Sequence, residues 1–129
     1  MPAYENTQPP YSVARGDVQA IVNAQQLGSG NFSERVAIAQ QDGNPPGPLS
    51  LSFSYASTPS SVEYDVYVSV DDTIAPGTAG SKYIKIGSTT NVNGDLVAIN
   101  TLAGGYRFRF LCVKEVTSPG VNATVKVQQ

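Results

Sequence analysis

The sequence predicts an all-β protein built as an antiparallel β-sandwich or barrel. Short segments in which apolar and polar residues alternate recur along the chain, and clusters of Gly, Pro, Asn and Ser separate them at intervals of roughly 8 to 12 residues. Only 14% of the residues are charged, against about 25% in an average globular protein, which is typical of short strands joined by tight turns. Together these observations indicate about seven to eight strands in an immunoglobulin-like or jelly-roll-like arrangement.

The most regular of these segments is residues 62–70, which alternates with a period of two. Successive side chains of a pleated strand point to opposite faces, so one face of this strand is expected in the core and the other in solvent. The core face carries Val62, Tyr64, Val66, Val68 and Val70, and the solvent face carries Glu63, Asp65, Tyr67 and Ser69.

Three further segments alternate in the same way. Residues 49–55 place Leu49, Leu51, Phe53 and Tyr55 inward and Ser50, Ser52 and Ser54 outward, on a small and uncharged face. Residues 106–113 place Tyr106, Phe108, Phe110 and Cys112 on a core face and Arg107, Arg109, Leu111 and Val113 on the other. Residues 121–127 place Val121, Ala123, Val125 and Val127 inward.

Four weaker segments complete the expected fold. Residues 17–27 fit either a short helix or a strand, and we interpret them as a strand. Residues 32–40 form one expected strand in which Phe32, Val36 and Ile38 share a face, followed by a Pro- and Gly-rich loop at residues 41–48. Residues 82–86 and 96–101 form short strands, and Asn93-Gly94 between them predicts a type I′ hairpin turn.

The outer faces of two predicted strands carry opposite charges. If residues 62–70 and 106–113 are neighbours, Glu63 and Asp65 can pair with Arg107 and Arg109, because both pairs have the same two-residue spacing. Each such cross-strand ion pair would contribute about 0.2–1 kcal/mol and would help to set the register. The alternative is that either charged pair faces another subunit.

Residues 1–16 show no periodicity and predict an extended N-terminal arm, which leaves residues 17–129 as a single β-sandwich domain. Chain ends commonly fray, so one interpretation is a disordered arm. The other is an arm that binds a neighbouring subunit, which its two tyrosines favour because their rings are apolar and their tips polar. The predicted partner-binding residues are Tyr4, Pro9, Pro10 and Tyr11.

Composition and charge exclude several classes of function. The chain has 8 Lys and Arg against 10 Asp and Glu, a formal charge of -2 with no basic block, so neither nucleic acid nor an anionic membrane is an expected partner. No apolar segment approaches the roughly 18 residues that span a bilayer, and the first residues lack the pattern of a signal peptide. We therefore expect a soluble protein made in the cytoplasm.

The residues that catalysis usually needs are missing from the pattern. The chain has no histidine, which excludes Ser-His-Asp and Cys-His systems and most zinc sites, and it has one cysteine, Cys112, which is expected to be a buried small hydrophobe. The close carboxylate pairs, Glu63 with Asp65 and Asp71 with Asp72, are better explained as a strand face and a strand-ending turn. The sequence therefore predicts no catalytic, metal or cofactor site and no enzyme.

Residues 62–127 resemble small β-sandwich structural proteins of tailed bacteriophages. The resemblance rests on four stretches in order: Tyr-Asp-Val-Tyr-Val-Ser-Val-Asp-Asp from residue 64, Lys-Tyr-Ile-Lys-Ile-Gly from 82, Gly-Gly-Tyr-Arg-Phe-Arg-Phe-Leu-Cys-Val from 104 and Val-Asn-Ala-Thr-Val-Lys-Val from 121. It implies a non-enzymatic virion protein, a capsid decoration or cement protein that binds the capsid exterior and stabilises contacts between shell subunits. Its implied partners are the major capsid protein or other virion subunits and further copies of itself, as a homo-oligomer.

Two alternatives remain open at this point. One is a neck or tail component of the phage particle. The other is a carbohydrate-binding β-sandwich module, which usually stacks exposed Trp or Tyr rings on sugars. The chain has no Trp, and the tyrosines expected to be exposed are Tyr4, Tyr11, Tyr67 and Tyr83.

Overall fold

The computed structural model describes residues 11–13, 18–38, 49–99 and 108–128, and these residues form ten β-strands. The strands are β1 (Tyr11–Val13), β2 (Val18–Gln25), β3 (Asn31–Phe32), β4 (Val36–Ile38), β5 (Leu49–Tyr55), β6 (Glu63–Ser69), β7 (Ile84–Thr89), β8 (Asp95–Ile99), β9 (Phe110–Thr117) and β10 (Ala123–Gln128). The described part of the chain contains no helix of the length and apolarity needed to cross a membrane.

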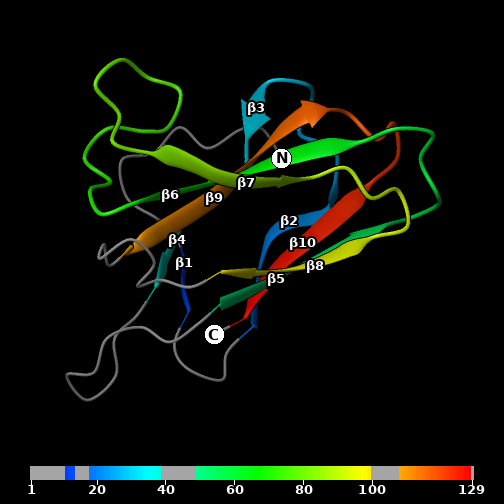
Figure 1. Ribbon diagram of the computed structural model, residues 1–129, viewed down its shortest axis with the longest axis horizontal. Helices are drawn as coiled ribbons and strands as arrows, with labels where there is room; N and C mark the ends of the chain where they lie inside the picture. The colour runs from blue at the N-terminus through cyan, green and yellow to red at the C-terminus, as the bar shows by residue number, and fades with distance from the viewer. Residues whose placement is uncertain (1–10, 14–17, 39–48, 100–107, 129) are drawn as a thin grey trace.

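The strands form two sheets that pack face to face (Figure 1). Sheet A has the order β1-β4-β9-β6-β7, with the short β3 also paired to β9, and sheet B has the order β2-β10-β5-β8. The described strand pairs are antiparallel apart from β1 and β4, which are parallel. The predicted all-β sandwich is confirmed, with more strands than expected because residues 32–40 divide into two and residues 11–13 add one.

The core lies between the two sheets and follows the alternation of the best predicted strands. Sheet B contributes Leu49, Leu51, Phe53, Ala123, Val125 and Val127, and sheet A contributes Tyr64, Val66, Val68, Val36 and Ile38. Full burial of a Val, Leu or Ile side chain stabilises a fold by about 1.5–3 kcal/mol, so these strands hold the sandwich together. The inward faces predicted for residues 49–55 and 121–127 are confirmed except at two positions: Tyr55 is only partly buried, and Val121 lies before β10 and is not in the core.

The predicted strand at residues 62–70 ends one residue early, at Ser69. Val70 was predicted to lie in the core, but it is 53% exposed. The Ser69 hydroxyl accepts a hydrogen bond from the Asp71 amide, and this turn takes the chain out of the sheet before Val70. The opposite face also differs from the expectation. Asp65 and Ser69 are buried, since this face of sheet A is covered by other parts of the chain.

Strand β9 reverses the two faces predicted for residues 106–113. Leu111 and Val113 lie in the sandwich core, whereas Cys112 is buried on the opposite side of sheet A. Phe108 and Leu111 both face the core although they are three residues apart, so the alternation of inward and outward side chains shifts by one residue between them. Strand β9 is central in sheet A and buried on both faces, so its apolar residues gave no usable alternation.

The cross-strand ion pairs predicted for β6 and β9 are wrong, although the two strands are neighbours. The antiparallel register places Glu63 opposite Thr117 and Asp65 opposite Lys114. The Arg109 amide donates to the Ser69 carbonyl at the other end of β6, and Arg107 lies outside the described residues. Asp65 instead pairs with Lys85 of β7, at 3.4 Å between Nζ and Oδ2.

Two irregular regions explain the remaining differences. Strand β2 is confirmed, but Ile21 and Val22 are both in the core and Val18 is 52% exposed, because bulges interrupt its pairing with β10. The expected strand at residues 32–40 breaks at Ser33, whose backbone amide donates to the Val113 carbonyl and whose hydroxyl accepts from the Val113 amide. Phe32 consequently lies outside the core, against Tyr67.

The turn at Asn93-Gly94 is not the predicted type I′ hairpin. Gly94 has a φ of +93°, but Asn93 does not share this left-handed conformation, and the strands on either side belong to different sheets. The turn therefore carries the chain from β7 at the edge of sheet A to β8 at the edge of sheet B. The Gln41–Pro48 loop, the Gly104-Gly105 turn and Tyr106 lie outside the described residues.

Candidate interaction surface

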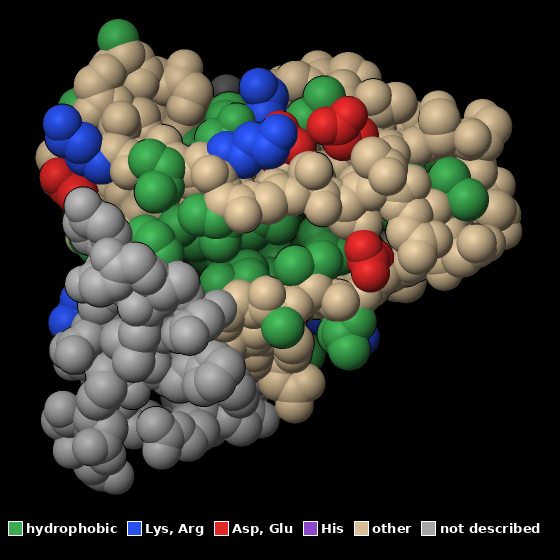
Figure 2. Space-filling view, viewed as in Figure 1, with side chains coloured by type: hydrophobic (Ala, Val, Ile, Leu, Met, Phe, Trp, Pro, Cys, Tyr) green, Lys and Arg blue, Asp and Glu red, His purple; other side chains and the backbone are tan. Residues whose placement is uncertain are grey.

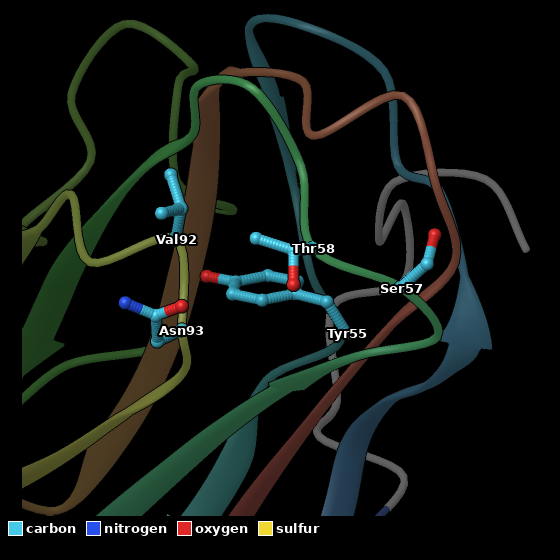
Figure 3. A pocket seen from close by; sticks show the side chains of 5 residues that line it. All are labelled: Tyr55, Ser57, Thr58, Val92 and Asn93. Atoms are coloured by element: carbon cyan, nitrogen blue, oxygen red, sulfur yellow. The ribbon is translucent and has the colours of Figure 1, made fainter.

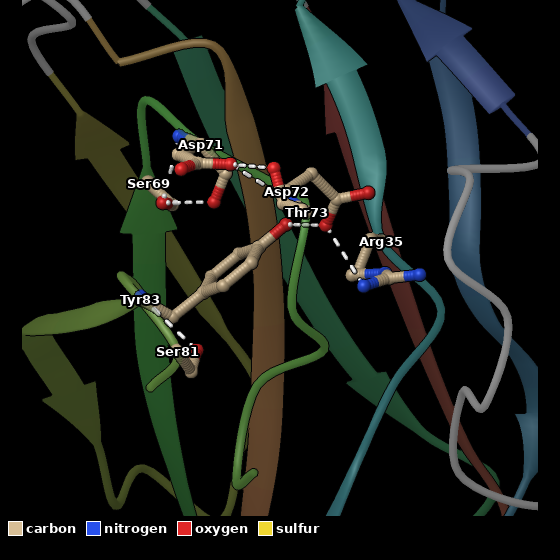
Figure 4. Close-up of polar contacts among 7 residues, drawn as sticks. All are labelled: Arg35, Ser69, Asp71, Asp72, Thr73, Ser81 and Tyr83. Carbon is tan, nitrogen blue, oxygen red and sulfur yellow. Dashed lines mark hydrogen bonds and ion pairs between the residues drawn. The ribbon is translucent and has the colours of Figure 1, made fainter. Parts of the chain in front are cut away.

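The outer face of sheet A is covered by a segment of its own chain, residues 71–83. A Cβ atom added at Gly77 of this segment would lie 2.8 Å from the ring of Phe32, so the backbone packs directly on that side chain. Near one end of the segment, Asp72 forms an ion pair with Arg35, at 2.9 Å between Oδ1 and Nη1. The hydroxyl of Tyr83, at the other end, donates a hydrogen bond to the same carboxylate oxygen at 2.6 Å (Figure 4). This face is therefore occupied by a buried polar network.

Burial governs the electrostatics of that network. It raises the pKa of the Asp72 carboxyl, while the Tyr83 hydrogen bond and Arg35 act in the opposite direction. Burial also raises the pKa of the Tyr83 hydroxyl, with a further contribution from its bond to Asp72. The Cys112 thiol is fully buried nearby and its pKa is raised for the same reason, which keeps it protonated and unreactive at neutral pH.

By contrast, no segment among the described residues packs over the outer face of sheet B. The register of its strands brings ten side chains to this surface, which we call the sheet B face: Val18 and Ala20 of β2, Thr124, Lys126 and Gln128 of β10, Ser50, Ser52 and Ser54 of β5, and Leu96 and Ala98 of β8. Each is exposed or only partly buried. Lys126 is the one charged member of the ten and lies between Ser52 and Ala20 of the adjacent strands.

The side chains of the sheet B face differ between its centre and its margins. Its central side chains are short, so ordering them at an interface costs little conformational entropy. Its two margins carry apolar side chains that the chain's own core does not use, with Leu96 70% exposed and Val18 52% exposed. The sheet B face therefore combines an uncharged serine-rich centre, one lysine and two exposed apolar side chains at its margins.

A polar pocket lies where the end of β5 meets the turn between β7 and β8 (Figure 3). It has a volume of about 170 Å³ and is lined by Tyr55, Ser57, Thr58, Val92 and Asn93. The Tyr55 hydroxyl points toward the Val92–Asn93 turn, and burial together with the nearby Asp95 raises its pKa to about 12. The lining offers hydroxyl and amide groups and one aromatic ring, which are neutral hydrogen-bonding and stacking groups.

A second buried carboxylate, Glu115, belongs to the structure of the sandwich. Its Oε2 atom accepts hydrogen bonds from the Leu27 amide at 2.7 Å, the Gly28 amide at 3.2 Å and the Tyr64 hydroxyl at 3.4 Å. It thereby fixes the turn after β2 to the centre of sheet A. Within the described ranges, His, Cys, Asp and Glu side chains form no group of three that could hold a metal ion.

The residues predicted to bind a partner are placed only in part. Tyr4, Pro9 and Pro10 lie outside the described residues. Tyr11 was predicted to lie in an arm outside the fold. In the structure it begins β1, which pairs with β4, and it is opposite Val36. Of the tyrosines expected to be exposed, Tyr83 is buried and Tyr67 is partly buried against Phe32.

The sequence indicated parts of the sheet B face separately, as the three outward serines of residues 49–55 and as Thr124 and Lys126 of residues 121–127. The alternation of residues 49–55 indicated an outward Ser50, Ser52 and Ser54, but nothing in the sequence showed that β8 and β10 flank them. The pocket was missed entirely because its residues come from a strand end and two loops.

Comparisons with known proteins give the fold and no family. A scan against protein-family models found no match, and a search of curated proteins found no relative. Among solved structures, the chain is similar to the crystal structure of the SPBc2 prophage-derived protein YomS, with a TM-score of 0.52 and 18% sequence identity, over 86% of this chain and 90% of that chain. At this level of identity the two proteins share a fold.

Proposed function

We propose that the protein is a non-enzymatic structural protein of a phage particle, and specifically a decoration or cement protein that binds the capsid exterior and stabilises contacts between shell subunits. Two independent likenesses support a phage origin. Its fold resembles that of a prophage-derived protein, and residues 62–127 resemble phage β-sandwich proteins in sequence.

The observation that carries the proposal is the contrast between the two sheets. Residues 71–83 pack over part of the outer side of sheet A, whereas no described segment covers the sheet B face, which carries a single charge. A surface of this kind is suited to a broad contact with a second protein. Each copy would bury a modest area, and the symmetry of the particle would multiply it into strong attachment.

The test is the copy number of the chain in purified phage particles from its source, measured by quantitative mass spectrometry against the major capsid protein. A number comparable to that of the capsid protein is expected for a decoration protein. A handful of copies per particle would replace that assignment by a neck or tail component. Absence from particles would contradict the proposal.

Charge reversal at the centre of the sheet B face is expected to weaken attachment. Lys126 is exposed, so Lys126→Glu should change the free energy of unfolding by less than about 0.5 kcal/mol. If a carboxylate of the particle faces Lys126, the variant should bind particles stripped of this protein at least about 30-fold more weakly, because reversed charges at an interface cost about 2 kcal/mol or more.

The matched control is Lys82→Glu, the same change at an exposed lysine outside the sheet B face. Co-sedimentation with stripped particles measures both variants. Equal binding by Lys126→Glu and the wild type would show that Lys126 does not contact the particle.

Deletion of residues 1–10 is expected to reduce attachment without changing the fold. This deletion retains β1, whereas removal of residues 1–16 would also strip a strand from the edge of sheet A. The melting temperature by circular dichroism should stay within about 2 °C of wild type, while the fraction bound to particles falls. Undiminished binding would show that Tyr4, Pro9 and Pro10 do not contact the particle.

A second candidate function, saccharide binding, rests on the pocket at Tyr55. Its ring, the Asn93 amide and two hydroxyl side chains are groups that recognise sugars. A glycan array tests this function directly, with Tyr55→Ala as the variant that should lose any signal. A glycan signal retained by Tyr55→Ala would place sugar binding elsewhere.

A further inference from the structure

On one side of the sandwich, β7 and β8 lie at the edges of sheets A and B, and among the described strands each pairs with one neighbour only. Hydrophobic side chains are visible in a hollow between the two sheets along this side (Figure 2). Unpaired edge strands with apolar side chains are sites where further strands add, unless they are blocked.

Strand β7 carries both an empty position and a projecting side chain on its inward face. Gly87 is opposite the core residue Val66, and a Cβ atom added at Gly87 would meet nothing within 4 Å. Ile84 is opposite the core residue Val68, yet it is 53% exposed because no described strand lies beyond β7. Ile86 is an extra residue in the pairing with β6, so Ile84 and Gly87 share a face although they are three residues apart.

We propose that two copies of the chain pair through β7, antiparallel and around a two-fold axis, with Ile84 of each copy opposite Gly87 of the other. Directly opposite residues in an antiparallel pair lie on the same face of the sheet. The projecting isoleucine of each copy then occupies the space that the glycine of the other leaves. One strand supplies both halves of the contact, which is the requirement for a two-fold interface.

The charges of β7 are compatible with this pairing. The two-fold axis of this pairing passes beside Lys85, so the lysines of the two copies come close, and each is paired with Asp65 of its own chain, which offsets their repulsion. The aliphatic stem of Lys85 would also cover Ile86 of the second copy, which is 40% exposed in the single chain. The pairing uses the free edge of β7 in both copies, so it closes as a dimer and does not continue into a fibre.

Strand β8, the edge strand on the same side of the sandwich, lacks this self-complementarity. Strand β8 directs its most exposed apolar residue, Leu96, to the outer side of sheet B, opposite Ser52. Pairing through β7 leaves the sheet B face of both copies free. The inference therefore goes beyond the proposed function, and a dimer would form in solution whether or not the protein binds a particle.

Cysteine cross-linking tests the register directly. In Ile84→Cys/Gly87→Cys, the two cysteines of one chain lie ~10 Å apart along the strand, too far for a disulfide, whereas opposite positions across two copies have Cβ atoms about 4.5–5.5 Å apart. Mild oxidation should give a covalent dimer on a non-reducing gel. The native Cys112 is fully buried and contributes no background.

The matched control is Leu96→Cys/Ala98→Cys on edge strand β8, which should remain monomeric on the gel. Analytical ultracentrifugation of the wild type should give about twice the 13.6 kDa of one chain. Ile84→Asp, at an already exposed position, should keep the circular dichroism spectrum and weaken dimerisation at least tenfold. A monomeric wild type, an Ile84→Asp variant that dimerises as well as wild type, or equal cross-linking of the control would overturn the proposal.

Discussion

Replacement of Arg35 by leucine is expected to lower the free energy of unfolding by about 3–5 kcal/mol, because it leaves a buried carboxylate without its cation. The Arg35 side chain is fully buried, and its ion pair with Asp72 joins the segment before β4 to the segment after β6. In the variant, Asp72 retains the hydroxyl of Tyr83 as its remaining described partner. Urea denaturation followed by circular dichroism measures the loss.

Two further variants show whether the loss comes from the ion pair. The double variant Arg35→Leu/Asp72→Leu should be more stable than the sum of its two single changes implies, because it leaves no unpaired charge. Lys85→Leu is the exposed control: the side chain of Lys85 is 48% exposed, so loss of its pair with Asp65 should cost at most about 1 kcal/mol. Additive losses in the double variant would show that Arg35 and Asp72 are not energetically coupled.

The sequence predicted the strands that have one buried and one exposed face. Residues 49–55 coincide with β5, and the inward valines of β6 and β10 were assigned correctly, because one polar face makes the period of two visible. For strand β9 the same reasoning was wrong, because it placed Cys112 on the core face and Leu111 and Val113 on the other. Cys112 is buried on one side of it and Leu111 on the other, so no face is polar and the pattern does not say which side meets the core.

The polar interior of the protein gave no local signal. Arg35 and Glu115 are both fully buried, although arginine and glutamate are among the residues most often exposed. Their partners are distant in sequence: Asp72 for Arg35, and the amides of Leu27 and Gly28 for Glu115. Contacts of this kind depend on how strands are ordered in the sheet, which one chain's pattern of residues does not specify.

The same reason limited the prediction of the interaction surface. The outward serines of β5 were correctly placed, yet a row of serines suits solvent as well as a protein partner. What distinguishes the sheet B face is its setting between Leu96 and Val18, together with the single charge of Lys126. Strand order brings these residues together, and strand order was not predictable here.

Three tyrosines whose hydroxyl groups are buried are expected to make the fold sensitive to alkaline pH. Burial is the main cause that raises the pKa of Tyr55 to about 12, and it raises the pKa of Tyr64 and Tyr83 further, with contributions from Glu115 and Asp72 respectively. The unfolded chain keeps the ordinary tyrosine value of 10.0 and so loses these protons first. Their contribution to stability is therefore complete below pH 10 and is lost as the pH rises above it.

The loss should be steep because the three hydroxyls act together. Each tyrosine that stays protonated in the folded state and ionises in the unfolded state lowers the free energy of unfolding by about 1.4 kcal/mol per pH unit, which gives about 4 kcal/mol per pH unit for three. The buried thiol of Cys112, whose pKa burial also raises, adds to the same trend from pH 9 upward. A domain with a total stability of about 5–15 kcal/mol should therefore unfold cooperatively about one to three pH units above pH 10, where the unfolded tyrosines ionise.

Urea midpoints measured at successive pH values, together with the ultraviolet absorbance of tyrosinate, follow this transition. Tyrosinate absorbance from the buried residues should appear together with the loss of the circular dichroism signal and not before it. Tyr55→Phe should reduce the fall in the free energy of unfolding by about 1.4 kcal/mol per pH unit, the contribution of one proton, since phenylalanine cannot ionise. A slope unchanged by this substitution, or tyrosinate absorbance that rises fully while the fold persists, would show that the Tyr55 hydroxyl is accessible in the folded state and is not held neutral by burial.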